Sequence, residues 1–525
     1  MTHVDYLIKN ALVIDGTGRP GQRLDVSICN DKIFDIGKDS PNAKSIIDGE
    51  NFILSPGFID IHGHTDHYLC IDPECSSKVL QGVTTEVFGN CGYSPVIHKK
   101  FFRSHFSREC RMYPLNARWN DLDTFSAETQ NHRPAMNWMS LVGHGSLRIA
   151  AMGHNQRPPS SHELEWMKHE LEKAMDQGAC GLSTGLIYTP GCFASQKEII
   201  SLCKVVSKKR GFYATHMKSE GDHLIESIEE SIQTAQESQV PLQISHLKTA
   251  GEKNWQKLDE ALATLETGIM DGVDISWDRY PYSASYTSLD TSLPRSLFDG
   301  GDSKAVERLK SPKVRKKMSE IILSKGPHFN QTLIASVRHP SDIERLGQSL
   351  ETCALNAGRS IPDFVIDLLI RNKMQVYAIF FSMSDENLKI ILRHPKTMIG
   401  SDAAARTAGG KTFEKVVHPR TYGTFPRVIS EYVLKNQLLS LEDAIRKMTG
   451  LTADRLKLKK RGYIKKGNFA DLVLIHQKNI RDRATFANPT LNSSGIEWVF
   501  VNGKPVVRRG LQTKFRTGRF IPYEP

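Results

Sequence analysis

The sequence predicts an α/β fold: a (β/α)8 TIM barrel with a small β-sandwich domain formed by the two chain ends and an inserted lobe. Strand and helix signals alternate through the middle of the chain, which is typical of a barrel of parallel strands. Both ends of the chain carry β signals only. Between two of the predicted barrel strands the chain is much longer than one βα unit needs, and this indicates the inserted lobe.

The two chain ends, residues 1–55 and 461–525, are predicted to form one small β domain together. Neither end has enough strands for a sandwich of its own, so joining them is the economical solution. Asn502-Gly503 is a two-residue turn of the kind that closes a hairpin. The expected β segments are Tyr6–Val13, Arg23–Cys29, Lys32–Ile36, Ala470–Ile475, Glu497–Val501 and Lys504–Arg508.

Residues 56–460 are predicted to form the barrel. Amphipathic helices are expected between the strands, for example over Glu163–Gln177 and His223–Ser238. The long interval precedes the last strand, so the inserted lobe, about 292–349, is expected between barrel strands 7 and 8 and over the barrel mouth. The eight strands are expected to end near Asp60, Phe88, Val142, Gly185, His216, His246, Trp277 and Gly400.

Composition indicates a soluble globular protein. Of 525 residues 39% are hydrophobic and 24% are charged, and no run approaches the roughly 18–20 apolar residues of a membrane span. The N-terminus shows no secretory signal pattern. The nine cysteines are odd in number and scattered, which is typical of a reducing compartment, so a cytoplasmic location is expected.

The net charge of +11 does not by itself indicate nucleic-acid binding. The basic residues are dispersed, and no aromatic-interleaved basic face accompanies them. The segment 99–114 is basic and is interpreted as a solvated loop, with a pocket-entrance or subunit-contact role left open. We therefore expect a small-molecule partner and neither nucleic acid nor membrane, with the oligomeric state undetermined.

Histidines at strand ends predict a metal site. His62 and His64 follow the first strand, and side chains at i and i+2 of an extended chain point to the same side. Active sites of such barrels lie at the carboxyl ends of the strands. Further ligand types follow other strands: Cys91, His216, His246 and Asp402. A thiolate combined with imidazoles favours zinc over magnesium or calcium.

Short motifs spread along almost the whole chain resemble the N-acyl-D-amino-acid deacylases (D-aminoacylases) of the amidohydrolase superfamily. Among them, Asn90-Cys91-Gly92 is diagnostic, because many relatives in the superfamily use a carboxylated lysine to bridge two metals where these deacylases use the cysteine. The other motifs include residues 55–64 (SPGFIDIHGH), 81–85 (QGVTT), 141–145 (LVGHG), 181–188 (GLSTGLIY), 215–217 (THM), 245–248 (SHLK), 280–282 (YPY), 400–402 (GSD) and 423–427 (GTFPR).

This resemblance implies a zinc-dependent enzyme that hydrolyses the amide bond of N-acyl-D-amino acids to a carboxylate and a free D-amino acid. It implies that one tightly bound zinc is held by Cys91, His216 and His246. His62 and His64, with Asp402 nearby, would line a second, weaker metal position. Asp402 is the expected general base for the metal-activated water and then the general acid for the leaving amine.

Substrate contacts are assigned to three residues. Lys248 lies two residues beyond His246 and is expected to bind the α-carboxylate of the substrate. Tyr188 and Tyr282 would add hydroxyl donors, with core packing as the alternative for both. The extra positive charge of Arg279 and Arg295 suggests an acidic side chain such as D-glutamate or D-aspartate.

Departures from the family pattern bear on the pocket. Tyr286 follows the Tyr-Pro-Tyr motif where a small residue is expected, so it would narrow the acyl or side-chain pocket. Ala403-Ala404-Ala405 follows Asp402, where the family often continues with glycine.

Two alternatives remain at this level. One is a dihydropyrimidinase-like cyclic-amide hydrolase, against which Cys91 and Lys248 argue. The other is a non-catalytic amidohydrolase-fold assembly protein, against which the full set of metal-type ligands argues. The preferred D-amino acid, the acyl group and the number of metals are left open.

Overall fold

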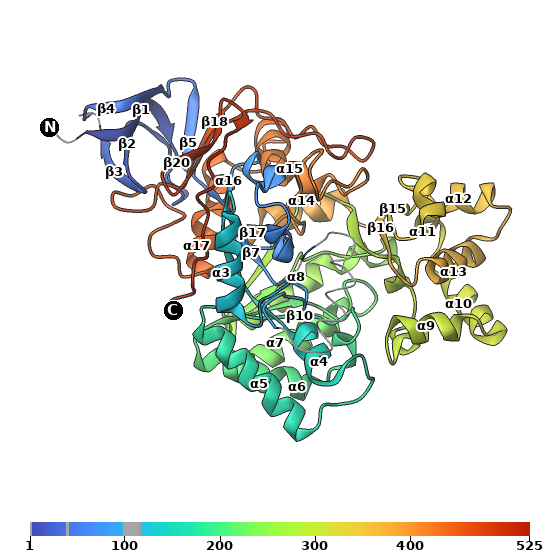
Figure 1. Ribbon diagram of the computed structural model, residues 1–525. Coiled ribbons are helices and arrows are strands. Elements are labelled where there is room, and N and C mark those ends of the chain that lie inside the picture. The colour runs from blue at the N-terminus through green and yellow to red at the C-terminus, as the bar shows by residue number, and fades with distance from the viewer. Residues whose placement is uncertain (1–2, 38–40, 98–114, 116) are drawn as a thin grey trace.

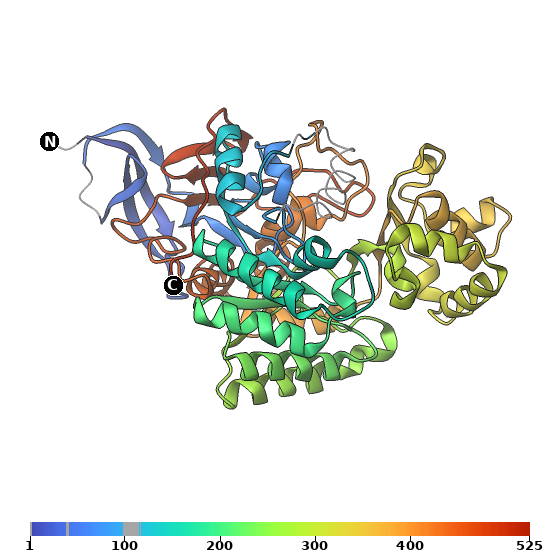
Figure 2. The same cartoon turned by 60° about the horizontal axis from the view of Figure 1, so that its bottom comes forward.

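A computed structural model describes residues 3–37, 41–97, 115 and 117–525. It confirms the predicted barrel at the centre of the molecule, with a β domain on one side and a helical lobe on the other (Figures 1 and 2). The basic segment 99–114 lies outside the described residues. Within the described part of the chain, every helix is too short or too polar to cross a membrane.

The barrel strands end where the sequence places them, with only small shifts. The third strand is broken at Leu141, and its two halves pair with different neighbours, β8 with β7 and β9 with β10. The strands are β6 (Phe58–Asp60), β7 (Val83–Phe88), β8 (Asn137–Ser140), β9 (Val142–Gly143), β10 (Gly181–Gly185), β11 (Phe212–His216), β12 (Leu242–Ile244), β13 (Ile275–Arg279) and β17 (Thr397–Ile399).

Helices that lie between these strands or follow the last of them cover the outside of the barrel. The predicted helix over Glu163–Gln177 is α5, which begins at a capping box in which Ser160 and Glu163 satisfy each other's backbone N–H groups. The helices are α1 (Ser76–Val79), α3 (Leu122–His132), α4 (His144–Met152), α5 (Ser161–Asp176), α6 (Gln196–Lys208), α7 (Leu224–Ser238), α8 (Leu258–Met270), α14 (Asp385–Arg393), α15 (Arg420–Arg427), α16 (Leu441–Met448) and α17 (Gly450–Arg455).

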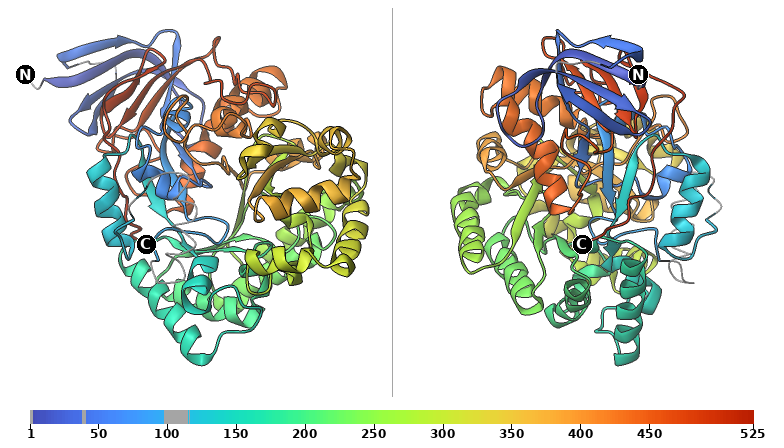
Figure 3. Two further views of the ribbon diagram at one scale, coloured as in Figure 1. Left: turned by 45° about the vertical axis from the view of Figure 1, so that its right-hand side comes forward. Right: turned by 90° about the vertical axis from the view of Figure 1, so that its left-hand side faces the viewer.

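The two chain ends meet in one nine-stranded sheet. β5 pairs antiparallel with β18, and this pairing joins the N-terminal strands to the C-terminal ones. Figure 3 shows the blue and red strands side by side. Both halves contribute to one core that includes Val26, Ile28, Leu472 and Phe500. The strands are β1 (Val4–Val13), β2 (Gln22–Cys29), β3 (Lys32–Gly37), β4 (Ala43–Asp48), β5 (Phe52–Pro56), β18 (Leu472–His476), β19 (Ile496–Val501), β20 (Lys504–Arg508) and β21 (Leu511–Gln512).

The lobe between β13 and β17 has a hydrophobic core of its own, which runs from Leu289 to Ala378. It therefore extends beyond the expected segment 292–349 on both sides. The reason is that its base is an antiparallel sheet, in which β16 pairs with both β14 and β15. Its elements are β14 (Ser285–Ser288), α9 (Asp302–Leu309), α10 (Pro312–Leu323), α11 (Pro327–Asn330), β15 (Leu333–Val337), α12 (Leu350–Asn356), α13 (Ile361–Arg371) and β16 (Val376–Phe380).

The barrel closes between β6 and β17 through the fully buried ammonium of Lys78. Its Nζ donates to Asp60 Oδ2 at 2.6 Å, to Ser401 Oγ at 2.7 Å and to the carbonyl of Ala403 at 2.8 Å. Glu86 Oε2 lies 3.0 Å from the same nitrogen. Lys78 therefore ties together the segments that follow the first and the last barrel strands.

We predict that Lys78→Met lowers the free energy of unfolding by about 3–5 kcal/mol, because it leaves buried carboxylates without their counter-charge. Urea denaturation measures the change. Lys208→Met, at an exposed position of α6, is the matched control and should stay within about 0.5 kcal/mol of the parent protein. Equal stability of Lys78→Met and the control would contradict this account of the closure.

Candidate metal centre and active site

Three imidazoles surround the thiol of Cys91. Its Sγ lies 3.4 Å from His62 Nε2, 3.6 Å from His216 Nδ1 and 3.6 Å from His246 Nε2. His216 is the last residue of β11, while the other donors follow β6, β7 and β12. The carboxyl ends of four barrel strands thus converge on one sulfur atom.

A second group of donors adjoins the first. His64 Nε2 lies 3.0 Å from Asp402 Oδ1, and His62 Nε2 lies 3.6 Å from the same oxygen. The ligand atoms of His62, His64, Cys91 and Asp402 all lie within 4.8 Å of one another, and the same holds for Cys91, His216 and His246. Cys91 therefore belongs to both groups, whereas the sequence analysis placed it in the first only.

Three of these residues have left-handed backbone, which non-glycine residues rarely adopt. The φ angles are 51° at Cys91, 38° at His246 and 50° at Asp402. Tertiary hydrogen bonds hold two of them: the amide of His246 donates to Asp278 Oδ1 at 2.9 Å, and the amide of Asp402 donates to the carbonyl of His62 at 2.7 Å. This strain aims the side chains into one small volume.

Glycine is required beside the donors because the chain segments approach so closely. A Cβ at Gly400 would lie 2.6 Å from the Cβ of His62, and one at Gly63 would lie 2.1 Å from the Glu86 side chain. The glycine between the two histidines therefore makes room for Glu86, which accepts hydrogen bonds from the amide and hydroxyl of Thr65.

The surrounding charges favour the ionised forms of Cys91 and Asp402. Burial raises the pKa of the Cys91 thiol, but His62, His216 and His246 outweigh burial and hold it well below its usual range. Burial likewise raises the pKa of Asp402, and Arg420 with the histidines lowers it well below its usual range. The thiolate and the carboxylate are the forms that bind a metal and accept a proton.

Three further residues support the donors, and the sequence analysis missed all of them. Asp278 Oδ1 lies 3.0 Å from His62 Nδ1 and fixes that imidazole. Arg420 Nη1 lies 2.8 Å from Asp402 Oδ2, so Oδ1 is the oxygen that faces the histidines. Glu220 Oε1 lies 2.7 Å from His246 Nδ1. Only Asp278 had a local signal, since it stands at the end of a predicted strand.

The predicted substrate residues lie at different distances from the donors. Lys248 is buried beside the centre, with its Nζ 2.8 Å from His246 Nδ1 and paired with Glu220. The half-buried Tyr188 packs edge-on against His216, with ring centroids 5.0 Å apart, and its hydroxyl lies 2.8 Å from Thr287 Oγ1.

Tyr282 packs away from the donors, against His418 and Arg427. Its motif partner Tyr280 stands closer to the centre, with Lys248 Nζ 6.0 Å from the ring centroid and the Arg420 guanidinium carbon 4.5 Å from it. Burial raises the pKa of Tyr280, but the neighbouring cations outweigh burial and lower it.

The arginines expected to select an acidic side chain contact other parts of the protein, although Nε and Nη1 of Arg279 have no hydrogen-bond partner among the described residues. Arg295 pairs with Asp290 and donates to the carbonyl of Leu293 at 2.7 Å. The fully buried Arg279 stacks on Tyr280 and donates to the carbonyl of Tyr282 at 2.9 Å. Neither contact supports the expectation that these arginines bind an acidic side chain of the substrate.

The tyrosine expected to narrow the pocket belongs to the base of the lobe. Tyr286 lies on β14 and stacks on Tyr377 of β16, with ring centroids 5.5 Å apart. Its carbonyl accepts a hydrogen bond from Arg420 at 3.3 Å, so this strand also adjoins the residue that pairs with Asp402.

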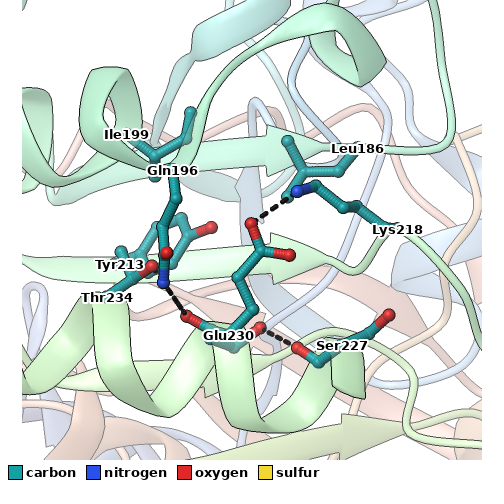
Figure 4. A pocket seen from close by; sticks show the side chains of 9 residues that line it. Leu186, Gln196, Ile199, Tyr213, Lys218, Ser227, Glu230 and Thr234 are labelled. Atoms are coloured by element: carbon teal, nitrogen blue, oxygen red, sulfur yellow. Dashed lines mark hydrogen bonds and ion pairs between the residues drawn. The ribbon is translucent and has the colours of Figure 1, made fainter. Parts of the chain in front are cut away.

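A separate small cavity lies on the outer side of the barrel and is not the centre described above (Figure 4). It is lined by residues of α6, α7 and β11, among them Tyr213 and Thr234. Lys218 and Glu230 form an ion pair within it. None of the metal-type donors lines this cavity.

Comparisons with known proteins show the family of this chain. The chain is 35% identical to a D-aminoacylase from Alcaligenes xylosoxydans xylosoxydans over 98% of this chain and 97% of that protein. The chain belongs to the D-aminoacylase family of amidohydrolases. Residues 380–507 also match the amidohydrolase family by themselves.

Two solved structures extend the comparison to the fold. The N-acyl-D-glutamate deacylase of Bordetella bronchiseptica, complexed with zinc and a phosphonate mimic of the tetrahedral intermediate, superposes with a TM-score of 0.83 at 30% identity. That match covers 99% of this chain and 100% of the other. The structure of a D-aminoacylase with a binuclear metal center superposes with a TM-score of 0.83 at 34% identity. That match covers 98% of this chain and 99% of the other.

The donors fit zinc by their chemistry. One thiolate and two imidazoles make the kind of three-ligand set that leaves a fourth position open for water or substrate. The Nε2 of His216 is buried without a hydrogen-bond partner, and its Nδ1 faces Cys91. Cys91, His216 and His246 would hold the ion, and His62, His64 and Asp402 adjoin it.

Proposed function

We propose that this protein hydrolyses the amide bond of N-acyl-D-amino acids and releases a carboxylate and a free D-amino acid. The observation that carries the proposal is one buried thiolate that faces three imidazoles, with an ionised carboxylate on one side and a lysine ammonium on the other. The preference for the D-enantiomer is taken from the family alone.

Cys91, His216 and His246 would hold the zinc, which would supply Lewis acidity and lower the pKa of a water toward about 7. Asp402 performs the proton transfers. Its Oδ2 is held by Arg420, so Oδ1 accepts the proton of the attacking water and later donates it to the departing amine nitrogen. One carboxylate serves both steps because the proton it receives is the proton it delivers.

Lys248 binds the α-carboxylate of the substrate. Its buried ammonium lies beside the metal donors, with Nζ 2.8 Å from His246 Nδ1. A charge-assisted contact at this distance fixes the substrate so that its amide carbonyl faces the donors. Tyr188 and Tyr280, which adjoin His216 and Lys248 respectively, shape the walls of this position.

Chiral product analysis tests the proposed reaction. Zinc-loaded protein is expected to release free amino acid from N-acetyl-D-amino acids and not from the L-enantiomers, and metal-stripped protein should release neither. Readdition of zinc should restore the activity. Zinc-loaded protein that releases neither enantiomer would contradict the proposal and would direct the search to cyclic amides.

We predict that Asp402→Asn lowers kcat by about 10²–10⁴-fold, because the amide cannot accept the proton of the attacking water. The zinc content, measured by elemental analysis, should stay at the level of the parent protein. Asp259→Asn, on the exposed side of α8, is the matched control. Near-normal turnover in Asp402→Asn would contradict the assignment of Asp402 as general base and general acid.

We predict that Lys248→Met raises KM by about 10- to 100-fold, the value of one hydrogen bond to a charged group. The measurement compares an N-acyl-D-amino acid with the corresponding N-acyl amine that lacks the carboxylate. The parent protein should have a lower KM for the substrate with the carboxylate, and the variant should have similar KM values for both. An unchanged KM for the carboxylate substrate would exclude the assignment.

A further inference from the structure

Glu220 stands where three functional side chains meet. It lies in the loop after β11, four residues beyond His216, and only 13% of its side chain is exposed. Its Oε1 is 2.7 Å from His246 Nδ1 and forms the ion pair with Lys248 Nζ. Its Oε2 is 3.7 Å from His216 Nε2. One carboxylate thus contacts a lysine and two imidazoles.

The contacts of Glu220 are with the ring nitrogens that point away from the metal position. His246 turns its Nε2 to Cys91 and its Nδ1 to Glu220, and His216 turns its Nδ1 to Cys91 and its Nε2 to Glu220. At 2.7 Å Glu220 is placed to accept the Nδ1–H of His246, and a carboxylate that accepts the N–H of a ligating imidazole fixes its tautomer and orientation and strengthens metal binding. At 3.7 Å the Nε2 of His216 is too far for a hydrogen bond, so its contact with Glu220 is electrostatic only. Burial raises the pKa of Glu220, and Lys248 with the two histidines holds it well below its usual range.

The backbone of Glu220 has a separate task. Its carbonyl accepts the amide of Ala250 at 2.6 Å and so joins the loops that follow β11 and β12. A glutamine at this position retains that hydrogen bond and the length of the side chain. The Glu220→Gln substitution therefore removes the negative charge and replaces one acceptor oxygen by an NH2 group, and leaves the backbone contact unchanged.

We propose that Glu220 is a positioning residue that orients the zinc-binding imidazole of His246 and the substrate-binding Lys248 at once. The proposal rests on the proposed function in one respect, the role of Lys248 toward the substrate carboxylate. Because the same oxygen contacts His246 and Lys248, metal affinity and substrate affinity depend on one side chain.

Two measurements on Glu220→Gln test the proposal. Zinc affinity is measured by chelator competition without substrate and is expected to fall about 10- to 100-fold. KM for an N-acyl-D-amino acid is measured at saturating zinc and is expected to rise about 3- to 10-fold, since Lys248 loses its acceptor. Lys248→Met should raise KM and leave zinc affinity unchanged, so only Glu220→Gln should change both.

The control is Glu252→Gln, which removes the charge of an exposed glutamate whose Oε2 lies 2.7 Å from His328 Nε2. Both quantities should stay at the parent values. Glu220→Asp keeps the charge and moves it back by one methylene, so its zinc affinity and KM should lie between those of the parent protein and Glu220→Gln. It replaces the glutamine variant in the test if that variant does not fold.

Wild-type zinc affinity in Glu220→Gln would overturn the proposal, and so would a lowered affinity with an unchanged KM at saturating zinc. Failure of the proposed function gives a different result. In that case the zinc-loaded parent protein would hydrolyse no N-acyl-D-amino acid and would give no KM, while the zinc affinities of the parent and Glu220→Gln could still be compared.

Discussion

The ammonium of Lys78 is the interaction on which the rest of the structure depends. A barrel is complete only when its first and last strands meet, and here the segments that follow them are joined by the backbone bridge Gly63 to Ala403 and by the amide of Asp402, which donates to the carbonyl of His62. Lys78 adds a side-chain attachment through Asp60, Ser401 and Ala403, and Ser401 also donates to Asp60 directly. Two of its partners, Ser401 and Ala403, flank Asp402, so the charge that helps to close the barrel also fixes this carboxylate beside the histidines.

The same closure explains why the donors accept an unfavourable backbone. Left-handed residues cost of order 1–3 kcal/mol each and persist only where the surroundings impose them. At Asp402 the surroundings are the Lys78 contacts on either side and the hydrogen bond to the carbonyl of His62. The buried positive charge thus holds the backbone of Asp402 in its unfavourable conformation. At Cys91 the tight turn at Gly92 has the same effect, and this turn requires glycine because a Cβ on Gly92 would lie 2.7 Å from the amide nitrogen of Gly185.

Sequence reasoning reached the barrel and its donors because both leave local patterns. The strands are short apolar runs with ligand-type residues at their ends, and Cys91, His216 and His246 follow or end strands where those patterns place them. The sequence did not predict the role of Lys78, because its partners Ser401 and Ala403 lie far along the chain. It did not predict the role of Glu220, because this residue lies in an irregular loop. The predicted lobe was too short for a related reason. Its base includes the pairing of β14 with β16, which lie near the two ends of the lobe sequence, and a pairing of such distant segments has no local sequence pattern.

The central claim is that one thiolate and the neighbouring imidazoles form the zinc site of this barrel. X-ray absorption spectroscopy at the zinc edge of the metal-loaded protein tests it most directly. The account predicts one sulfur ligand at about 2.3 Å together with nitrogen or oxygen ligands at about 2.0–2.1 Å. A spectrum that requires no sulfur ligand, or more than one sulfur per zinc, would contradict it.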